Sequence, residues 1–313
     1  MSISSEIERL QQAKKDIGDA IVRKGGSVSG TIDTYAKSVM ALGDVSFRTV
    51  IDIVNKSDAK NVDLTMISPK NETSLNYLFE GNTNLININV SNWDTSNIVS
   101  LNGALAQIPN LESIECEDWD VSNVTTFRAM FDNNQKLKKV DISKFDTTKS
   151  TSFEWFCSND FSLVELDVSN LKTQNCSLFH TMFGSCQSLT QLDVSNFDMS
   201  AATDCSSMFA YCISITSLDI SNFDLSNVKN IDYMFKRTLK LTTLKTTNLK
   251  LPNIDMGSIC FNECPLTVDS IVGLLNALPQ SDKGYSFQIG SVNIAKLSDE
   301  QKAIATNKGW TLI

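Results

Sequence analysis

The 313-residue chain has one histidine and five prolines, and its eight cysteines include no Cys-x-x-Cys pair. The missing cysteine pairs and the single histidine, His180, argue against a zinc site. No apolar run approaches the length of roughly 18 residues that a membrane span requires, so we expect no membrane insertion. The chain also lacks a glycine-rich phosphate loop and a Gly-x-Ser-x-Gly motif, and no nucleophile pattern accompanies His180. We therefore expect neither an enzyme nor a bound cofactor.

Acidic residues outnumber basic ones by 36 to 27, which gives a formal net charge of −9. An acidic surface repels phosphates, so we expect no nucleic-acid partner. The five prolines leave little room for long disordered linkers. A hydrophobic content of 42% is enough for a continuous core.

Apolar residues recur at a fixed interval over most of the chain, in steps of 26 along the numbering. One row, with a single leucine among its phenylalanines, contains Phe79, Leu105, Phe131, Phe183, Phe209, Phe235 and Phe261. A second row contains Leu85, Leu111, Leu137, Leu163, Leu189, Ile215 and Leu241, and a third contains Trp93, Trp119, Phe145, Leu171, Phe197, Phe223 and Leu249. A fixed period of this length indicates a repeat architecture.

One copy of the repeat shows what each unit can form. Leu192 and Val194 flank Asp193, which is the alternation of a short strand with one buried face. The polar residues that follow favour a turn, and the stretch 200–209 has room for one helical or 3₁₀ turn that carries Met208 and Phe209 inward. A single unit cannot bury its own apolar face, so neighbouring units must stack. The sequence predicts an α/β repeat solenoid, a leucine-rich-repeat-like stack of about eight 26-residue coils.

The string Met-Phe-x-x-Cys-x-x-Leu-x-x-Leu-Asp-Val-Ser-Asn-Phe-Asp, which begins at Met182, resembles the BspA-like leucine-rich repeat, the bacterial surface protein 26-residue repeat. The resemblance covers about residues 60–262. It implies surface or virion display and protein recognition, and it implies no catalytic residues because the family has none. One copy departs from the pattern, since Phe156 comes one residue early and Lys172 replaces the usual Asp. We expect an altered loop there.

The two ends of the chain lack the repeat, so we divide the chain into an N-terminal helical hairpin (1–45), a solenoid (46–262) and a C-terminal cap (263–313). In the cap, Thr267 is placed to begin a helix, and Ser298 with Gln301 has the spacing of a capping box. The hairpin carries an apolar stripe that consists of Ile3, Ile7, Leu10, Ile17 and Ile21.

The hairpin supports two interpretations. Its Ile-Glu-x-Leu-x-x-Ala-Lys string, which begins at Ile7, resembles the amino-terminal segments of some bacteriophage tail and head-fibre proteins. That resemblance implies that the apolar stripe docks to other virion proteins, and the seven-residue spacing of three of its members is compatible with a homo-trimer. The alternative is a polar cap over the first coil, which every solenoid needs.

Three cysteines, Cys186, Cys212 and Cys264, each come three residues after a repeat phenylalanine. A repeat position next to an inward ring favours buried, unreactive thiols. A disulfide between Cys186 and Cys212 stays open as an alternative, because stacked coils would place their Cα atoms about 5 Å apart.

Two acidic rows repeat with the same period. The first, called the acidic row below, is expected on the outward side of the strands and contains Glu115, Asp141, Asp167, Asp193 and Asp219. The second, called the turn row, contains Asp94, Asp120, Asp146, Asp198 and Asp224. We interpret the turn row as turn-capping residues. The acidic row has two interpretations: it binds a cation or a basic partner, or it is only solvated.

These observations lead to a functional hypothesis. The start of the sequence shows no signal-peptide pattern, although the repeat is of a surface type. We therefore expect a non-enzymatic structural or binding protein of a bacteriophage virion (tail, fibre or head decoration) that displays the solenoid to a host-surface protein or glycan. The alternative is a bacterial cell-surface adhesin exported by an unrecognised route.

Overall fold

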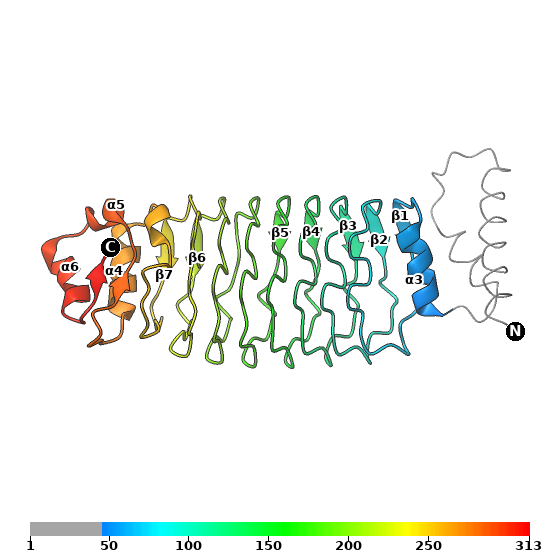
Figure 1. Ribbon diagram of the computed structural model, residues 1–313, viewed down its shortest axis with the longest axis horizontal. Coiled ribbons are helices and arrows are strands. Elements are labelled where there is room, and N and C mark those ends of the chain that lie inside the picture. Colours follow the sequence, from blue (N-terminus) through cyan, green and yellow to red (C-terminus); the bar gives the residue numbers. More distant parts are fainter. Residues whose placement is uncertain (1–45) are drawn as a thin grey trace, which may run out of the picture.

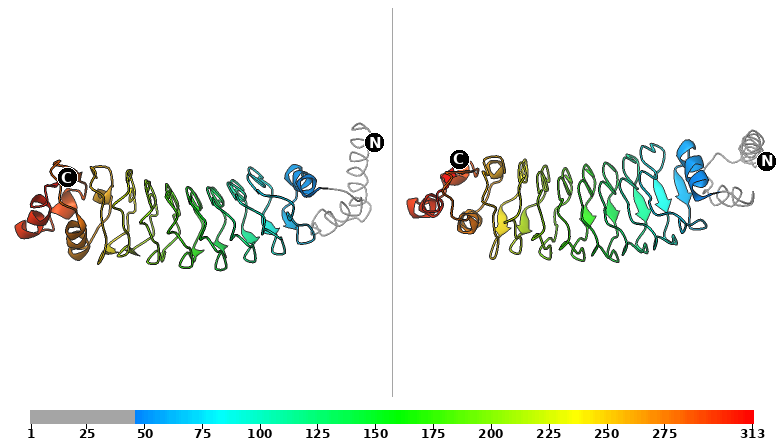
Figure 2. Two further views of the ribbon diagram at one scale, coloured as in Figure 1. Left: turned by 90° about the horizontal axis from the view of Figure 1, so that it is seen from below. Right: turned by 60° about the horizontal axis from the view of Figure 1, so that its bottom comes forward.

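The computed structural model describes residues 46–313, and these residues form one elongated stack of coils (Figures 1 and 2). Helix α3 (Phe47–Lys56) lies at one end of the stack, and the C-terminal helices lie at the other. The predicted repeat solenoid is confirmed. The apolar stripe of the hairpin (Ile3, Ile7, Leu10, Ile17, Ile21) lies outside the described residues.

Parallel strands join neighbouring coils on one side of the stack. They are β1 (Asn61–Asp63), β2 (Asn87–Asn89), β3 (Ser113–Glu115), β4 (Lys139–Val140), β5 (Glu165–Leu166), β6 (Ser217–Asp219) and β7 (Thr243–Lys245). The observed pairings join residues one repeat period apart, such as Val62 with Ile88 and Leu218 with Leu244. The strand predicted around Asp193 does not form, although Leu192 and Val194 are buried as expected. Alternation therefore determines which side chains face the core, but it does not guarantee the hydrogen bonds between coils.

A second parallel ladder follows at a different corner of each coil. Its bridges run from Ser74 and Ser100 to Asp204 and Asn230, again in steps of one period. The stretch 200–209 carries Met208 and Phe209 inward as predicted, but it forms no helix. The backbone N–H of Met208 donates to the carbonyl oxygen of Cys205 at 3.3 Å and closes a single turn, in which Ser207 has a φ of 55°, outside the helical region. The N–H of Phe209 donates to the carbonyl oxygen of Met234 in the next coil.

The aromatic rows form stacks inside the solenoid. Ring centroids lie 6.0 Å apart for Phe183 and Phe209, 5.5 Å for Phe209 and Phe235, and 5.7 Å for Trp93 and Trp119. Like the rings, the leucine rows are buried. Identical positions therefore touch in successive coils, as the repeat predicts.

The copy that departs from the repeat keeps its register. Cys157 bonds through its N–H to the carbonyl oxygen of Met182, just as Phe131 bonds to Phe156. Phe156 therefore occupies the position of Met182, and Cys157 occupies the position of Phe183. The expected altered loop is wrong here, because the two buried positions carry different side chains while the backbone hydrogen bonds keep their register.

All eight cysteines are free, and seven of them are buried. The Sγ atoms of Cys186 and Cys212 lie 2.9 and 3.0 Å from the carbonyl oxygens of Cys157 and Phe183. Burial raises the pKa of Cys212 to about 12. The predicted burial of Cys186, Cys212 and Cys264 is confirmed, and no disulfide joins Cys186 to Cys212.

The stack ends in α4 (Val268–Ala277), β8 (Ser286–Phe287), α5 (Ser291–Ile294), α6 (Asp299–Thr306) and β9 (Thr311–Leu312), preceded by the 3₁₀ helix η1 (Phe261–Glu263). Thr267 caps α4, and Ser298 with Gln301 forms the predicted capping box of α6. Strands β8 and β9 pair in parallel. Among residues 46–313, no helix has the length and apolar character needed to cross a membrane.

Candidate functional site

The acidic row lies where each coil leaves its strand and enters a turn. Glu115 and Asp219 end β3 and β6, while Asp141 and Asp167 directly follow β4 and β5. The Asp carboxylates each bond to the residue two positions later. Asp167 Oδ1, for example, accepts hydrogen bonds from Ser169 N at 2.9 Å and from Ser169 Oγ at 2.6 Å. These contacts fix the carboxylates and start the turn.

The same contacts lower the pKa of two members of the row, Asp141 and Asp167. Hydrogen bonds from Ser143 lower the pKa of Asp141, and hydrogen bonds from Ser169 lower the pKa of Asp167. Both side chains are exposed. The row therefore presents ordered negative charges to solvent, about 5 Å apart from coil to coil.

Lysines lie near two members of the row, Asp141 and Asp219. Lys245 Nζ lies 3.4 Å from Asp219, and Lys144 pairs with Asp118 beside Asp141. Within residues 46–313, no ion pair joins Asp167 or Asp193 to a cation. Asp167 and Asp193 are therefore two neighbouring members of the row whose charges no ion pair neutralises.

The turn row caps turns, as predicted. Asp94 Oδ1 accepts from Ser96 Oγ at 2.6 Å, and Asp198 Oδ1 accepts from Ser200 N at 3.0 Å. The hydroxyl and the backbone N–H of Ser96 lower the pKa of Asp94. Unlike the other members named here, Asp224 also bonds to a lysine of the next coil, Lys250, at 2.6 Å.

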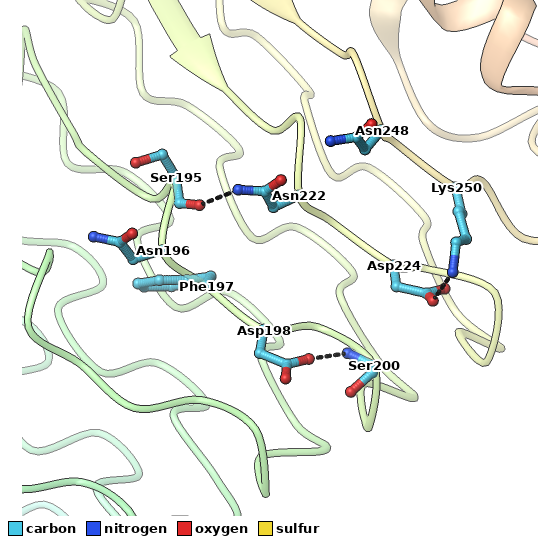
Figure 3. A pocket seen from close by; sticks show the side chains of 9 residues that line it. All are labelled: Ser195, Asn196, Phe197, Asp198, Ser200, Asn222, Asp224, Asn248 and Lys250. Atoms are coloured by element: carbon cyan, nitrogen blue, oxygen red, sulfur yellow. Dashed lines mark hydrogen bonds and ion pairs between the residues drawn. The ribbon is translucent and has the colours of Figure 1, made fainter.

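A shallow groove of about 500 Å³ is lined by Asp198 and Asp224 of the turn row together with Ser195, Asn222 and Lys250 (Figure 3). Some of its polar groups bond to one another: Asn222 Nδ2 donates to Ser195 O at 3.1 Å, and Lys250 pairs with Asp224. These contacts hold successive coils together.

His180 belongs to a polar network along the second ladder. Its Nδ1 lies 2.7 Å from Ser206 Oγ, and Ser206 Oγ donates to Asp204 Oδ1 at 2.5 Å. Since the only hydroxyl proton of Ser206 goes to Asp204, Nδ1 of His180 is the donor to Ser206. A nucleophile would need to give its proton to the histidine instead. The pair has the spacing of a catalytic dyad but the opposite hydrogen-bond direction.

Trp155 belongs to the coil before His180 and contacts both His180 and Arg128. The guanidinium carbon of Arg128 lies 4.4 Å from the Trp155 ring centroid, and the His180 ring packs edge-on at 4.9 Å. Sequence reasoning treated His180 as isolated. The signal that could have found Ser206 is its separation from His180 by one full repeat period.

No group of three or more His, Cys, Asp or Glu side chains within the described part of the chain is arranged to hold a metal ion. The structure brings the acidic row into one line. It places His180 near a different corner of the coil, with Ser206 and Trp155.

Comparisons with known proteins identify a family whose function is unknown. The model of a family described as "Mycoplasma protein of unknown function, DUF285" matches residues 73–161 and 154–267. No curated protein matches the chain. One similar solved chain, from "Crystal structure of TLR13-ssRNA13 complex", is 12% identical with a TM-score of 0.22. The alignment covers 82% of this chain and 55% of that chain, so this chain spans about half the length of that protein.

Proposed function

This chain belongs to the family described as Mycoplasma protein of unknown function, DUF285, and we propose that it is a non-enzymatic scaffold whose acidic row binds a basic protein segment. The proposal rests on the state of two carboxylates in the middle of the acidic row. Asp167 and Asp193 are exposed, held in place by Ser169 and Ser195, and not ion-paired.

Two physical effects favour binding at such a row. Carboxylates that are already fixed lose little conformational entropy when a partner arrives. A line of like charges also attracts an oppositely charged segment from a distance and orients it along the stack. An extended lysine-rich or arginine-rich segment can follow this row. Alternate side chains of an extended chain lie about 7 Å apart and the row offers a charge about every 5 Å, a difference that long, flexible basic side chains can bridge.

The hydrogen-bond direction in the His180 network supports a non-enzymatic role. Ser206 is only 4% exposed, and its proton is already committed to Asp204. The network therefore joins coils rather than offering a nucleophile.

The binding test uses an octalysine peptide as the probe and isothermal titration calorimetry as the measurement. The variant Asp167→Asn/Asp193→Asn removes two charges but keeps a side-chain oxygen that accepts the serine bonds. We expect it to weaken binding about fivefold to thirtyfold, since exposed ion pairs contribute up to about 1 kcal/mol each. Asp94→Asn/Asp120→Asn is the matched control, because it removes the same charge from the turn row.

The two variants separate a specific site from general electrostatics. A loss of affinity confined to the Asp167/Asp193 variant supports the proposal. An equal loss in both variants would show that the peptide senses only the net charge, and the acidic row would then have no special role.

Where the scaffold is displayed is a further part of the proposal. The BspA-like repeat pattern fits a surface-displayed protein, and the apolar stripe of residues 1–45 would dock it to a bacteriophage particle as a virion component. The family description names Mycoplasma, a bacterium, and this favours the second setting, the surface of a bacterial cell. Mass spectrometry of purified virions and protease shaving of intact cells distinguish the two. Detection in particles supports the first setting, and loss of the protein from shaved cells supports the second.

A further inference from the structure

One position of the repeat places hydrogen-bond donors inside the core. Each donor points at a carbonyl oxygen of the preceding coil. The contacts are Asn134 Nδ2 to Leu105 O at 2.8 Å, Cys186 Sγ to Cys157 O at 2.9 Å, Cys212 Sγ to Phe183 O at 3.0 Å and Thr238 Oγ1 to Phe209 O at 3.1 Å. We call this position the donor row.

Asp160 occupies the donor row between Asn134 and Cys186, one repeat period from each. Its side chain is fully buried. Its Oδ1 accepts from the backbone N–H of Asn134 at 2.7 Å, just as Asn134 Oδ1 accepts from the N–H of Ile108 at 3.0 Å. Asp160 therefore reproduces the acceptor half of the asparagine arrangement.

If Asp160 is ionised, the arrangement lacks its hydrogen-bond donor, because a carboxylate has no proton to donate. Asp160 Oδ2 is buried and has no hydrogen-bond partner. The corresponding carbonyl oxygen of the preceding coil belongs to Phe131, and it accepts from Asn134 Nδ2 at 2.7 Å. A carbonyl oxygen has two lone pairs, so it can accept a second bond. An unpaired buried charge would be strongly destabilising, whereas a protonated carboxyl supplies the missing donor.

We propose that Asp160 is held as a neutral carboxylic acid whose Oδ2–H donates to the carbonyl oxygen of Phe131, and that the middle of the solenoid loses stability as the pH rises. The repeat itself supports this assignment, since the next residues along the donor row all donate to the corresponding carbonyl of the coil before.

The surroundings favour the neutral form. The ionisable side chains that face Asp160 are Asp132 of the preceding coil, Cys157 of its own coil and Cys186 of the next. None of these three carries a positive charge; Arg128 acts on Asp132 instead. Burial raises the pKa of Asp160 well above its usual range, the Asn134 N–H opposes this, and the charge of Asp132 raises the pKa further.

The direction of the pH effect follows from proton linkage. Below about pH 4 the carboxyl is protonated in both the folded and the unfolded chain, and its contribution to stability is complete. Above that pH the unfolded chain releases the proton while the folded chain keeps it. The equilibrium constant for unfolding therefore rises up to tenfold per pH unit until the pKa of the folded state is reached.

The test compares the wild type with Asp160→Asn by urea denaturation between pH 3 and pH 8. Asparagine is the residue that already fills this position at Asn134, so the variant can supply both halves of the arrangement at any pH. We expect the ratio of the two unfolding constants, wild type over variant, to grow by up to tenfold per unit above about pH 4. A ratio that is constant with pH would overturn the proposal.

Asp167→Asn is the matched control, because Asp167 is an exposed aspartate of the same coil with a lowered pKa. For this variant the ratio of the unfolding constants, wild type over variant, should fall as the pH rises through the acid range, because the wild type gains stability when Asp167 ionises. The same slope in both variants would overturn the assignment to Asp160.

A second measurement does not depend on the folding of any variant. In wild-type protein labelled with ¹³C at the aspartate carboxyl carbons, NMR at pH 7 should show a protonated carboxyl. The variant Asp132→Asn should retain that signal, because Asp132 is only partly buried and already bonded to Ser158 and Asn159. Absence of any protonated aspartate at pH 7, or loss of the signal in Asp132→Asn, would overturn the proposal.

Discussion

Phe209 lies within a run of parallel rings, with its centroid 6.0 Å from that of Phe183 and 5.5 Å from that of Phe235, and its side chain is fully buried. Truncation to alanine leaves a cavity that the neighbouring coils cannot close, because the ladder bonds on both sides hold their spacing. Loss of a buried phenylalanine side chain costs about 3–5 kcal/mol of unfolding free energy. We expect Phe209→Ala to fall in this range in urea denaturation.

Tyr211→Ala provides the control for Phe209→Ala, since Tyr211 lies on the same coil and is exposed. Truncation of an exposed side chain changes stability by about 0.5 kcal/mol. In a stack whose coils touch only their neighbours, hydrogen exchange should also accelerate most at residues 183–235 and least near Trp93. Comparable losses in the two variants, or an equal acceleration along the whole chain, would refute the stacked-core reasoning.

Three further predictions concern single residues. Thr267→Ala should destabilise the protein by about 1 kcal/mol in thermal unfolding, since the Thr267 side chain caps α4. Iodoacetamide should label Cys260 before any other cysteine, because the other seven are buried, and mass spectrometry of digests checks the order. The Asp141→Asn variant should be less stable than the wild type at neutral pH, and this difference should disappear as the pH falls below about 4. The pKa of Asp141 is lowered in the folded protein, so its carboxylate stabilises the fold only while it is ionised.

The core of the fold could be predicted from the sequence because its rows repeat the same residue classes. A phenylalanine at one fixed interval allows few arrangements other than a stack, and the structure places Phe183, Phe209 and Phe235 in contact. The type of turn around Met208 could not be predicted. Short polar stretches are compatible with several kinds of turn, and the left-handed backbone of Ser207, which excludes a helical turn, has no signal in the repeat pattern.

The candidate sites could be predicted only in part, for a related reason. The acidic row was visible as a periodic carboxylate, but its bonds to Ser169 and Ser195 depend on turn geometry that the period does not specify. The contact between His180 and Ser206 joins different residue types at the same position of successive coils. A search for identical residues cannot detect such a pair.

The donor row shows that one repeat position accepts several chemical groups. An amide, a thiol and a hydroxyl donate to the buried carbonyl oxygen of the coil before at Asn134, Cys186 and Thr238, whereas Ile108, one period before Asn134, has no side-chain donor. From Asn134 onward the row therefore links successive coils through side-chain donors. Asp160 makes the same bond only while its carboxyl keeps a proton, so it is the link of this row that is sensitive to pH.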